Sequence, residues 1–165
     1  MIKLDDRDIK MLSILQREGR ITKTGLAERV NLSPTPCWER LKRLEKSGII
    51  EGSGAQISWM ALGAQTTVFM EAEIDSHQSS DFDRFEQAVQ RYDEILECWA
   101  VGGGLDYLLK IAVKTVDDYQ RLVDRLLNDQ IGLKKYFTYI VTKRVKDRCG
   151  IPDGLLKTLS PSEPN

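Results

Sequence analysis

One short stretch of the chain constrains the fold most, because it reads as a tight turn followed by an amphipathic helix. The apolar residues Cys37, Leu41 and Leu44 are spaced i, i+4, i+7, which places them on one helical face. Pro34 suits the first position of a helix, and Gly48 suits the position just after its end. The pattern predicts a helix between these two residues, with one face buried in a small core.

Two shorter helical patterns precede this one. Residues 5–18 carry apolar side chains at helical spacing with acidic residues in the first turn, and residues 23–30 repeat the spacing. Residues 31–33 form the turn to the third helix, and residues 49–58 read as a short hairpin. Three helices and a hairpin in about 58 residues predict a winged helix-turn-helix.

The rest of the chain follows a different order of elements. Strands are predicted at 66–74, 95–101, 107–113 and 135–145, and helices at 79–91 and 116–127. The order β-α-β-β-α-β is that of a ferredoxin-like fold, so the fold class is α+β. We expect a winged helix-turn-helix domain at 1–60, a linker at 61–65, a ferredoxin-like domain at 66–148 and a C-terminal tail at 149–165. The tail contains three of the five prolines and is expected to trail or pack loosely.

Composition excludes several classes of protein. Hydrophobic residues make up 41% of the chain, which argues against disorder. No window approaches the roughly 18 apolar residues of a membrane span, and the acidic N-terminus does not resemble a secretory signal. The three cysteines, Cys37, Cys98 and Cys149, are odd in number and widely spaced, which favours a reducing compartment without a disulfide framework. We therefore expect a soluble, cytoplasmic protein that does not associate with membranes.

Charge is distributed unevenly along the chain. The net charge is only −1, yet residues 1–60 carry 11 Lys and Arg against 8 Asp and Glu. Residues 61–165 carry 13 basic and 17 acidic side chains. This asymmetry favours a basic binding module joined to an acidic one.

The outer face of the third helix suits the major groove of DNA. With the apolar face turned inward, polar and basic side chains gather on the opposite face, and Trp38 and Arg40 lie on its flanks. Lys and Arg side chains donate to guanine or phosphate, and hydroxyls serve base or backbone. Ser33 can cap the helix and leave backbone N–H groups near a phosphate. The predicted DNA-binding residues are Ser33, Thr35, Pro36, Trp38, Glu39, Arg40, Lys42, Arg43 and Lys46.

The residues alone leave other interpretations open. A charged helix face can be merely solvated, Trp38 can pack on its own domain or on a dimer partner, and Glu39 can simply orient Arg43 at i+4. The order of elements favours the DNA-binding interpretation, because a short helix, a tight turn and a basic helix follow one another.

The sequence resembles the Lrp/AsnC (feast/famine) family of transcription regulators. The resemblance is carried by LSPTPCWERLKRLE at 32–45, GII at 48–50, LDDRD at 4–8 and DYLLK at 106–110, and it covers about residues 3–148. It implies an N-terminal winged helix-turn-helix and a C-terminal ACT-like (RAM) effector domain.

The resemblance also implies an assembly and an effector. It implies homodimers formed through the sheet of the ACT-like domain, assembled further into tetramers or octamers, and an amino acid or related metabolite bound between effector domains. A symmetric dimer presents two reading helices to a pseudo-palindromic operator on double-stranded DNA. The implied function is a sequence-specific transcription regulator whose DNA binding or oligomeric state responds to that effector.

The family's effector site includes the loop between the second and third strands and part of the last strand. The matching residues are Gly102, Gly103, Gly104, Leu105, Asp106, Tyr107, Tyr139, Ile140 and Val141. Glycines allow a ligand to approach the backbone, and Asp106 can hold an ammonium group. From the residues alone, Asp106 can equally be a turn residue and Tyr139 an interface aromatic. Many members have an acidic residue and an aromatic where this chain has Gly104 and Leu105, which implies a roomier or less acidic pocket.

Other functions find less support in the sequence. The one histidine, His77, lies in a polar stretch, and the glycines at 102–104 do not continue into a dinucleotide-binding motif. We predict no enzymatic activity, no catalytic residue, no metal site and no cofactor. Two alternatives remain: an architectural DNA-binding protein without a small-molecule effector, and an amino-acid sensor whose helix-turn-helix contacts protein.

Overall fold

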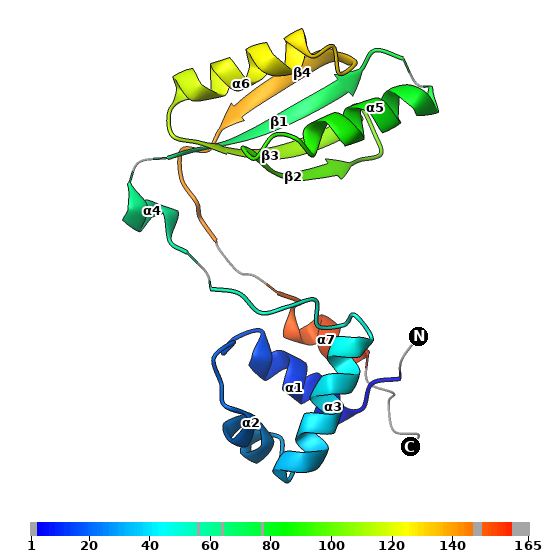
Figure 1. Ribbon diagram of the computed structural model, residues 1–165, viewed down its shortest axis with the longest axis vertical. Helices are drawn as coiled ribbons and strands as arrows, with labels where there is room; N and C mark the ends of the chain where they lie inside the picture. Colours follow the sequence, from blue (N-terminus) through cyan, green and yellow to red (C-terminus); the bar gives the residue numbers. More distant parts are fainter. Residues whose placement is uncertain (1–2, 56, 64, 77, 147–149, 160–165) are drawn as a thin grey trace. The chain divides into compact units, whose positions relative to one another are not determined.

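The computed structural model describes residues 3–55, 57–63, 65–76, 78–146 and 150–159. They form two units, shown in Figure 1. Unit 1 contains the described residues of 1–56 and 146–165, and unit 2 contains those of 57–145. The chain therefore leaves unit 1 after the helix-turn-helix segment and returns to it near the end.

Three helices make the first part of unit 1: α1 (Asp6–Leu15), α2 (Lys23–Arg29) and α3 (Pro34–Lys46). α1 starts with a capping box, in which the side chains of Asp5 and Asp8 each accept a hydrogen bond from the other's backbone N–H. The Thr22 hydroxyl accepts from the N–H of Gly25 at the start of α2. The three predicted helices are confirmed, each with slightly shorter bounds.

The predicted hairpin after α3 is wrong in the described part of 49–58, where no strand forms. Ile50 packs against the core near Leu44, but Ile49 and Ile57 are exposed. A hairpin without a buried apolar face is unstable in water, so this segment runs as an irregular loop. A short helix, α4 (Trp59–Leu62), follows it at the start of unit 2.

The C-terminal part of unit 1 is helical where a loose tail was expected. α7 (Asp153–Thr158) places Leu156, which is 2% exposed, in a cluster with Leu4, Ile9 and Leu44. The adjoining backbone is held as well, because Gln16, the C-cap of α1, exchanges two hydrogen bonds of 3.0 Å with the backbone of Ile151. The expectation of loose packing is therefore wrong for α7, which completes an apolar cluster that α1 and α3 leave open.

Unit 2 has the predicted β-α-β-β-α-β order. Its elements are β1 (Thr66–Ile74), α5 (Ser79–Val89), β2 (Ile95–Ala100), β3 (Tyr107–Val113), α6 (Val116–Asn128) and β4 (Leu133–Ile140). The four strands form one antiparallel sheet in the order β2-β3-β1-β4. β4 ends five residues before the predicted position, because its partner β1 begins at Thr66 and offers little further backbone to pair with.

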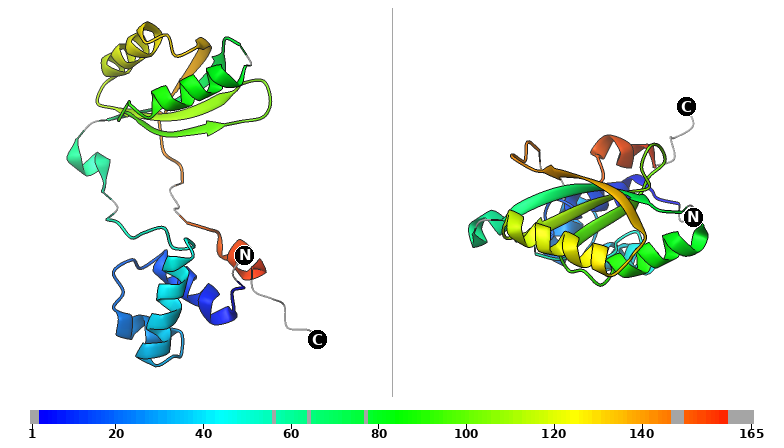
Figure 2. Two further views of the ribbon diagram at one scale, coloured as in Figure 1. Left: turned by 45° about the vertical axis from the view of Figure 1, so that its right-hand side comes forward. Right: turned by 90° about the horizontal axis from the view of Figure 1, so that it is seen from above.

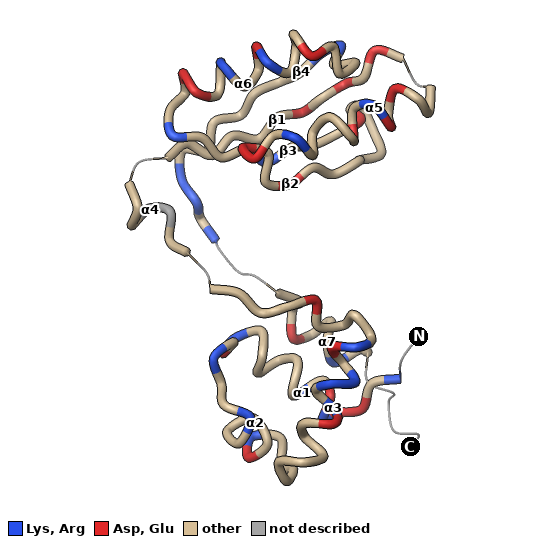
Figure 3. Tube along the Cα trace, viewed as in Figure 1, with Lys and Arg blue, Asp and Glu red and all other residues tan. Residues whose placement is uncertain are grey.

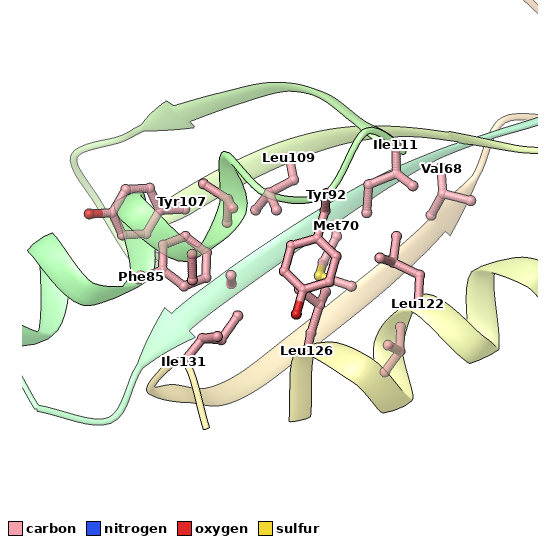
Figure 4. Close-up of a cluster of buried hydrophobic side chains, with 14 of the residues drawn as sticks. Val68, Met70, Phe85, Tyr92, Tyr107, Leu109, Ile111, Leu122, Leu126 and Ile131 are labelled. Atoms are coloured by element: carbon pink, nitrogen blue, oxygen red, sulfur yellow. The ribbon is translucent and has the colours of Figure 1, made fainter. Parts of the chain in front are cut away.

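The core of unit 2 lies between the sheet and its two helices. Alternate residues of β1 and β3, such as Met70 and Leu109, point toward Phe85 of α5 and Leu122 of α6 (Figure 4). Both helices lie against the same face of the sheet (Figure 2). The opposite face carries no helix within the described part of this unit. Among the described residues, no helix is both long and apolar enough to cross a membrane.

Candidate nucleic-acid interface and effector site

α3 turns one face to the core of unit 1 and leaves the other exposed. Cys37 and Leu44 are 2% and 0% exposed, and Leu41 packs against the same core as Cys37. Gly48 has a φ of +75°, a conformation that favours glycine, and it ends the helix as the sequence predicts. The predicted buried face of α3 is confirmed.

The two arginines of α3 form ion pairs with two carboxylates at the start of α1, those of its N-cap Asp5 and of Asp8. Arg40 Nη1 donates to Asp5 Oδ2 at 2.6 Å and to Asp8 Oδ1 at 2.9 Å. Arg43 Nη2 donates to Asp8 Oδ2 at 2.5 Å. Asp8 is 0% exposed, so both guanidinium groups compensate a buried charge. Arg43 is therefore oriented by Asp8 and not by Glu39.

The same cluster changes the acidity of Asp5. Burial alone would raise its pKa, but the N–H of Asp8 and the guanidinium of Arg40 outweigh that effect. The pKa of Asp5 therefore lies below its usual value, and the carboxylate stays charged beside Arg40.

Trp38 lies between lysines of two different helices. Its ring is half-buried, with Lys23 Nζ of α2 at 3.3 Å from the ring centroid and Lys42 Nζ of α3 at 5.0 Å. Trp38 thus packs on its own unit, one of the possibilities that the sequence leaves open. Lys23 is not among the residues predicted from the sequence, since only the fold brings the start of α2 to Trp38.

The remaining predicted DNA-binding residues lie on or beside the outer face of α3. Lys and Arg recur along this helix (Figure 3). Thr35, Lys42 and Lys46 are exposed, and Pro36 is half-buried. Ser33 occupies the N-cap position, but within the described residues around it its hydroxyl makes no capping hydrogen bond. Ser33 is thus the N-cap residue, as predicted, but without a side-chain capping bond, and it is exposed.

The glycine turn of unit 2 is fastened to the end of β1. Gly103 has a φ of +141°, a conformation that L side chains rarely adopt. Asp106 Oδ2 accepts from the N–H of Ile74 at 2.8 Å, and the Asp106 N–H donates to Ala72 O at 3.1 Å. Asp106 therefore has the role of a turn residue, whatever else it binds, while Gly102 and Gly104 are exposed and Leu105 is half-buried.

Tyr107 lies in the core and not in the turn. It is 3% exposed, its ring centroid lies 4.6 Å from that of Phe85, and its hydroxyl donates to Glu86 Oε1 at 2.8 Å (Figure 4). Burial and the Glu86 carboxylate raise the pKa of Tyr107. We therefore exclude its side chain from the candidate effector site.

The other predicted effector residues lie at the end of β4. Tyr139 pairs with Phe69 in register, Ile140 pairs with Val68, and the Val141 N–H donates to Thr67 O at 2.9 Å. Burial and a hydrogen bond with Glu71 raise the pKa of the Tyr139 hydroxyl.

The two halves of the predicted effector site are separated within one chain. Asp106 bonds to β1 at Ala72 and Ile74, whereas Tyr139–Val141 pair with residues 67–69 of the same strand. At about 3.3 Å per residue, three to seven residues of strand put them roughly 10–23 Å apart. A single chain does not bring the two halves together around one small ligand.

The face of the sheet opposite the helices carries aromatic side chains among charged ones. Strand register places Phe69, Trp99, Leu108, Phe137 and Tyr139 on this open face, together with Glu71, Glu73, Glu97, Lys110 and Lys135. Trp99 is 42% exposed, and Phe137 and Tyr139 are each 50% exposed. Several large exposed aromatics on one face are typical of a surface that another protein covers.

Two cavities lie away from these residues. One of about 320 Å³ lies between α1 and α7, lined by Ile9, Ser13 and Leu156 among others. The other, of about 500 Å³, lies in unit 2 beside Gln65, Glu94 and Lys114. Neither is lined by a residue of the predicted effector site.

Both units of the chain contain segments that match models of known protein families. Residues 4–51 match a family model described as a winged helix-turn-helix DNA-binding domain, and residues 67–151 match one described as the Lrp/AsnC ligand-binding domain. The transcriptional regulatory protein DoeX of Halomonas elongata is 52% identical over 145 residues, covering 88% of this chain and 92% of DoeX. The leucine-responsive regulatory protein of Escherichia coli K12 is 41% identical over 143 residues, covering 87% of each chain.

Solved structures share the fold. A transcriptional regulator of Neisseria meningitidis, crystallised as a complex with L-Met, superposes with a TM-score of 0.86 at 33% identity, covering 93% of this chain and 99% of its own. An AsnC-family regulator from Agrobacterium tumefaciens has the same TM-score of 0.86 at 28% identity, covering 92% of this chain and 99% of its own.

Proposed function

This chain belongs to the Lrp/AsnC family of DNA-binding transcription regulators, and on that premise we propose that it binds pseudo-palindromic operators as a homo-oligomer controlled by an amino acid or related metabolite. We assign DNA binding to residues 1–60 and effector binding and assembly to residues 66–148. The proposal involves no catalytic step, and it places the protein in the cytoplasm, with the DNA it controls.

The observation that carries the DNA-binding surface is the division of the basic residues of α3. Arg40 and Arg43 compensate the carboxylates of α1, while Lys42 and Lys46 remain exposed on the outer face. Thr35 and Ser33, near the start of the helix, reach the same face. We propose that these exposed side chains contact the DNA, together with Pro36 and Glu39, and that Trp38 supports this surface from beside it.

The open sheet face supports assembly through unit 2. Its aromatic side chains are exposed in one chain, and burying them against a second copy removes apolar surface from water. A two-fold interface of this kind also gives the reading helices the symmetry of a palindromic site. We propose a homodimer through this face, with tetramers or octamers as higher assemblies.

The separation of the two predicted effector segments supports a site completed by two chains. The turn 102–106 of one copy and residues 139–141 of another can meet across a two-fold axis, although they lie at different ends of β1 in one chain. The relative crystallised with L-Met supports an amino acid as the class of ligand.

Binding experiments test the proposal. We expect the protein to shift DNA from upstream of its own gene more tightly than shuffled DNA at 0.15 M salt, where binding to phosphate alone is weak. Isothermal titration with the twenty amino acids should find at least one ligand, and that ligand should alter the operator affinity. Equal affinity for upstream and shuffled DNA would refute the proposal that the protein is a sequence-specific regulator. If the protein binds its operator but none of the twenty amino acids, the architectural alternative is favoured.

A further inference from the structure

Lys23 and Lys42 come from different helices, yet both ammonium groups lie against the same indole. Lys23 is the first residue of α2, and Lys42 lies in the second half of α3, four residues after Trp38. Their Nζ atoms lie 3.3 Å and 5.0 Å from the Trp38 ring centroid, inside the range of about 6 Å for a cation–π contact. Two like charges are therefore gathered at one place on the surface of unit 1.

The partners of these lysines differ from those of the arginines on α3. Arg40 and Arg43 bind carboxylates, which cancel their charge toward an approaching anion. Across the described residues, neither Lys23 nor Lys42 is found in an ion pair. An aromatic ring orients an ammonium group through its quadrupole without neutralising it. The indole thus leaves the full charge available.

We propose that Trp38 is a positioning residue that holds the ammonium groups of Lys23 and Lys42 as a two-point clamp for the phosphates of the DNA backbone. The inference rests on the proposed DNA binding and deepens it. An ammonium is a compact, strongly hydrated point charge, which suits a phosphate without requiring a particular base. Both lysines are exposed, so neither has to leave a buried position to reach the DNA.

The clamp predicts a specific pattern of binding. Phosphate contacts release counterions, and each contributes about 0.9 to the slope of log K against log salt concentration. Phosphate contacts also act on every DNA sequence. Loss of the clamp should therefore flatten the salt dependence and weaken binding to operator and shuffled DNA by the same factor. A residue that reads bases changes the preference between sequences and leaves the slope unchanged.

The experiment measures affinity by fluorescence anisotropy between 0.05 and 0.3 M KCl for the full-length protein. We expect Lys23→Gln combined with Lys42→Gln to reduce the slope by about 1.8 for each half-site, the value for two phosphate contacts. Trp38→Leu should lose a large part of the same slope, and Trp38→Phe, which retains an aromatic face, should restore most of it. Lys157→Gln removes an exposed lysine on α7 of the same unit and serves as the matched control.

A combined variant separates positioning from direct reading. If Trp38 acts through the lysines, adding Trp38→Leu to the double lysine variant causes no further loss of affinity. An additive loss, or an altered preference for the operator with an unchanged slope, would show that Trp38 contacts bases itself and would overturn the inference.

Folding and function are controlled separately. The double lysine variant changes only exposed side chains, so an unchanged slope in that variant overturns the clamp even if Trp38→Leu fails to fold. If the wild-type protein does not prefer its operator to shuffled DNA, the proposed function as a sequence-specific regulator is refuted. The slope on shuffled DNA still decides whether the clamp exists.

Discussion

Asp8 is a buried carboxylate of unit 1, and its two oxygens accept hydrogen bonds from both arginines of α3. Removing one partner of such a cluster leaves a buried charge poorly compensated, which costs about 3–5 kcal/mol in fully buried cases. The basic residues of α3 therefore divide into arginines that stabilise the unit and lysines that face outward.

Arg43→Ala should lower the free energy of unfolding by about 2 kcal/mol, less than in fully buried cases because its side chain is 44% exposed and Arg40 remains. Thermal unfolding followed by circular dichroism measures the loss. Lys42→Ala is the matched control, and it should leave the midpoint unchanged. Equal midpoints for Arg43→Ala and wild type would contradict the role assigned to Asp8.

The lowered pKa of Asp5 gives a dependence on pH with a defined sign. The folded state keeps this carboxylate charged at lower pH than the unfolded state does. In the unfolded state the pKa of an aspartate is about 3.9. Its contribution to stability is therefore complete above that value and disappears as pH falls through the lower folded-state pKa. Urea unfolding between pH 6 and pH 3 should show a steeper decline for wild type than for Asp5→Asn, which retains a capping side chain. If the free energy of unfolding declines equally with pH in wild type and Asp5→Asn, the Asp5 carboxylate does not contribute to stability through this cluster.

At the scale of elements, the sequence predicts those with a strong periodic pattern. β1 and β3 alternate between buried and partly buried residues along their length, and their predicted bounds, 66–74 and 107–113, agree with the structure. α7 has no such pattern, because in six residues only Leu156 is buried and its partners lie about 110–150 residues earlier. The hairpin at 49–58 was predicted from turn residues alone, which do not supply the buried face a hairpin needs.

The same limit applies to the candidate site. The exposed face of α3 follows from helical spacing, so Lys42 and Lys46 could be predicted from the sequence. The diversion of Arg43 to Asp8 and the contact of Lys23 with Trp38 depend on how α1 and α2 pack on α3. Spacing within one helix contains no information about either contact.

Leu156 should be the residue through which α7 stabilises unit 1. Leu156→Ala removes a side chain that is 2% exposed, and we expect a loss of about 2–4 kcal/mol in the free energy of unfolding. Leu155→Ala, at a neighbouring position that is 56% exposed, should change it by less than about 0.5 kcal/mol. Chemical denaturation of both variants makes the comparison, and equal losses would mean that α7 is not docked as described.

For the whole molecule, the open face of the sheet sets the oligomeric state we expect. Phe137→Asp places a charge on that face, on the edge strand β4 and beside Glu71, where burial against a second copy would be unfavourable. Analytical ultracentrifugation should show smaller assemblies than for wild type. Leu127→Asp on α6, where the leucine is 45% exposed, is the matched control and should keep the wild-type assembly. Dissociation of the Leu127→Asp variant alone would place the interface on the helices.

The return of the chain to unit 1 has a consequence for biosynthesis. Leu156 is translated after every residue of unit 2, yet it fills the cluster of Leu4, Ile9 and Leu44. During synthesis on the ribosome, this apolar cluster of the helix-turn-helix therefore stays exposed until unit 2 and then α7 have emerged from the exit tunnel. A nascent chain stalled before α7 therefore carries a complete reading helix on an incomplete core, and the DNA-binding unit reaches full stability only after α7 has been translated.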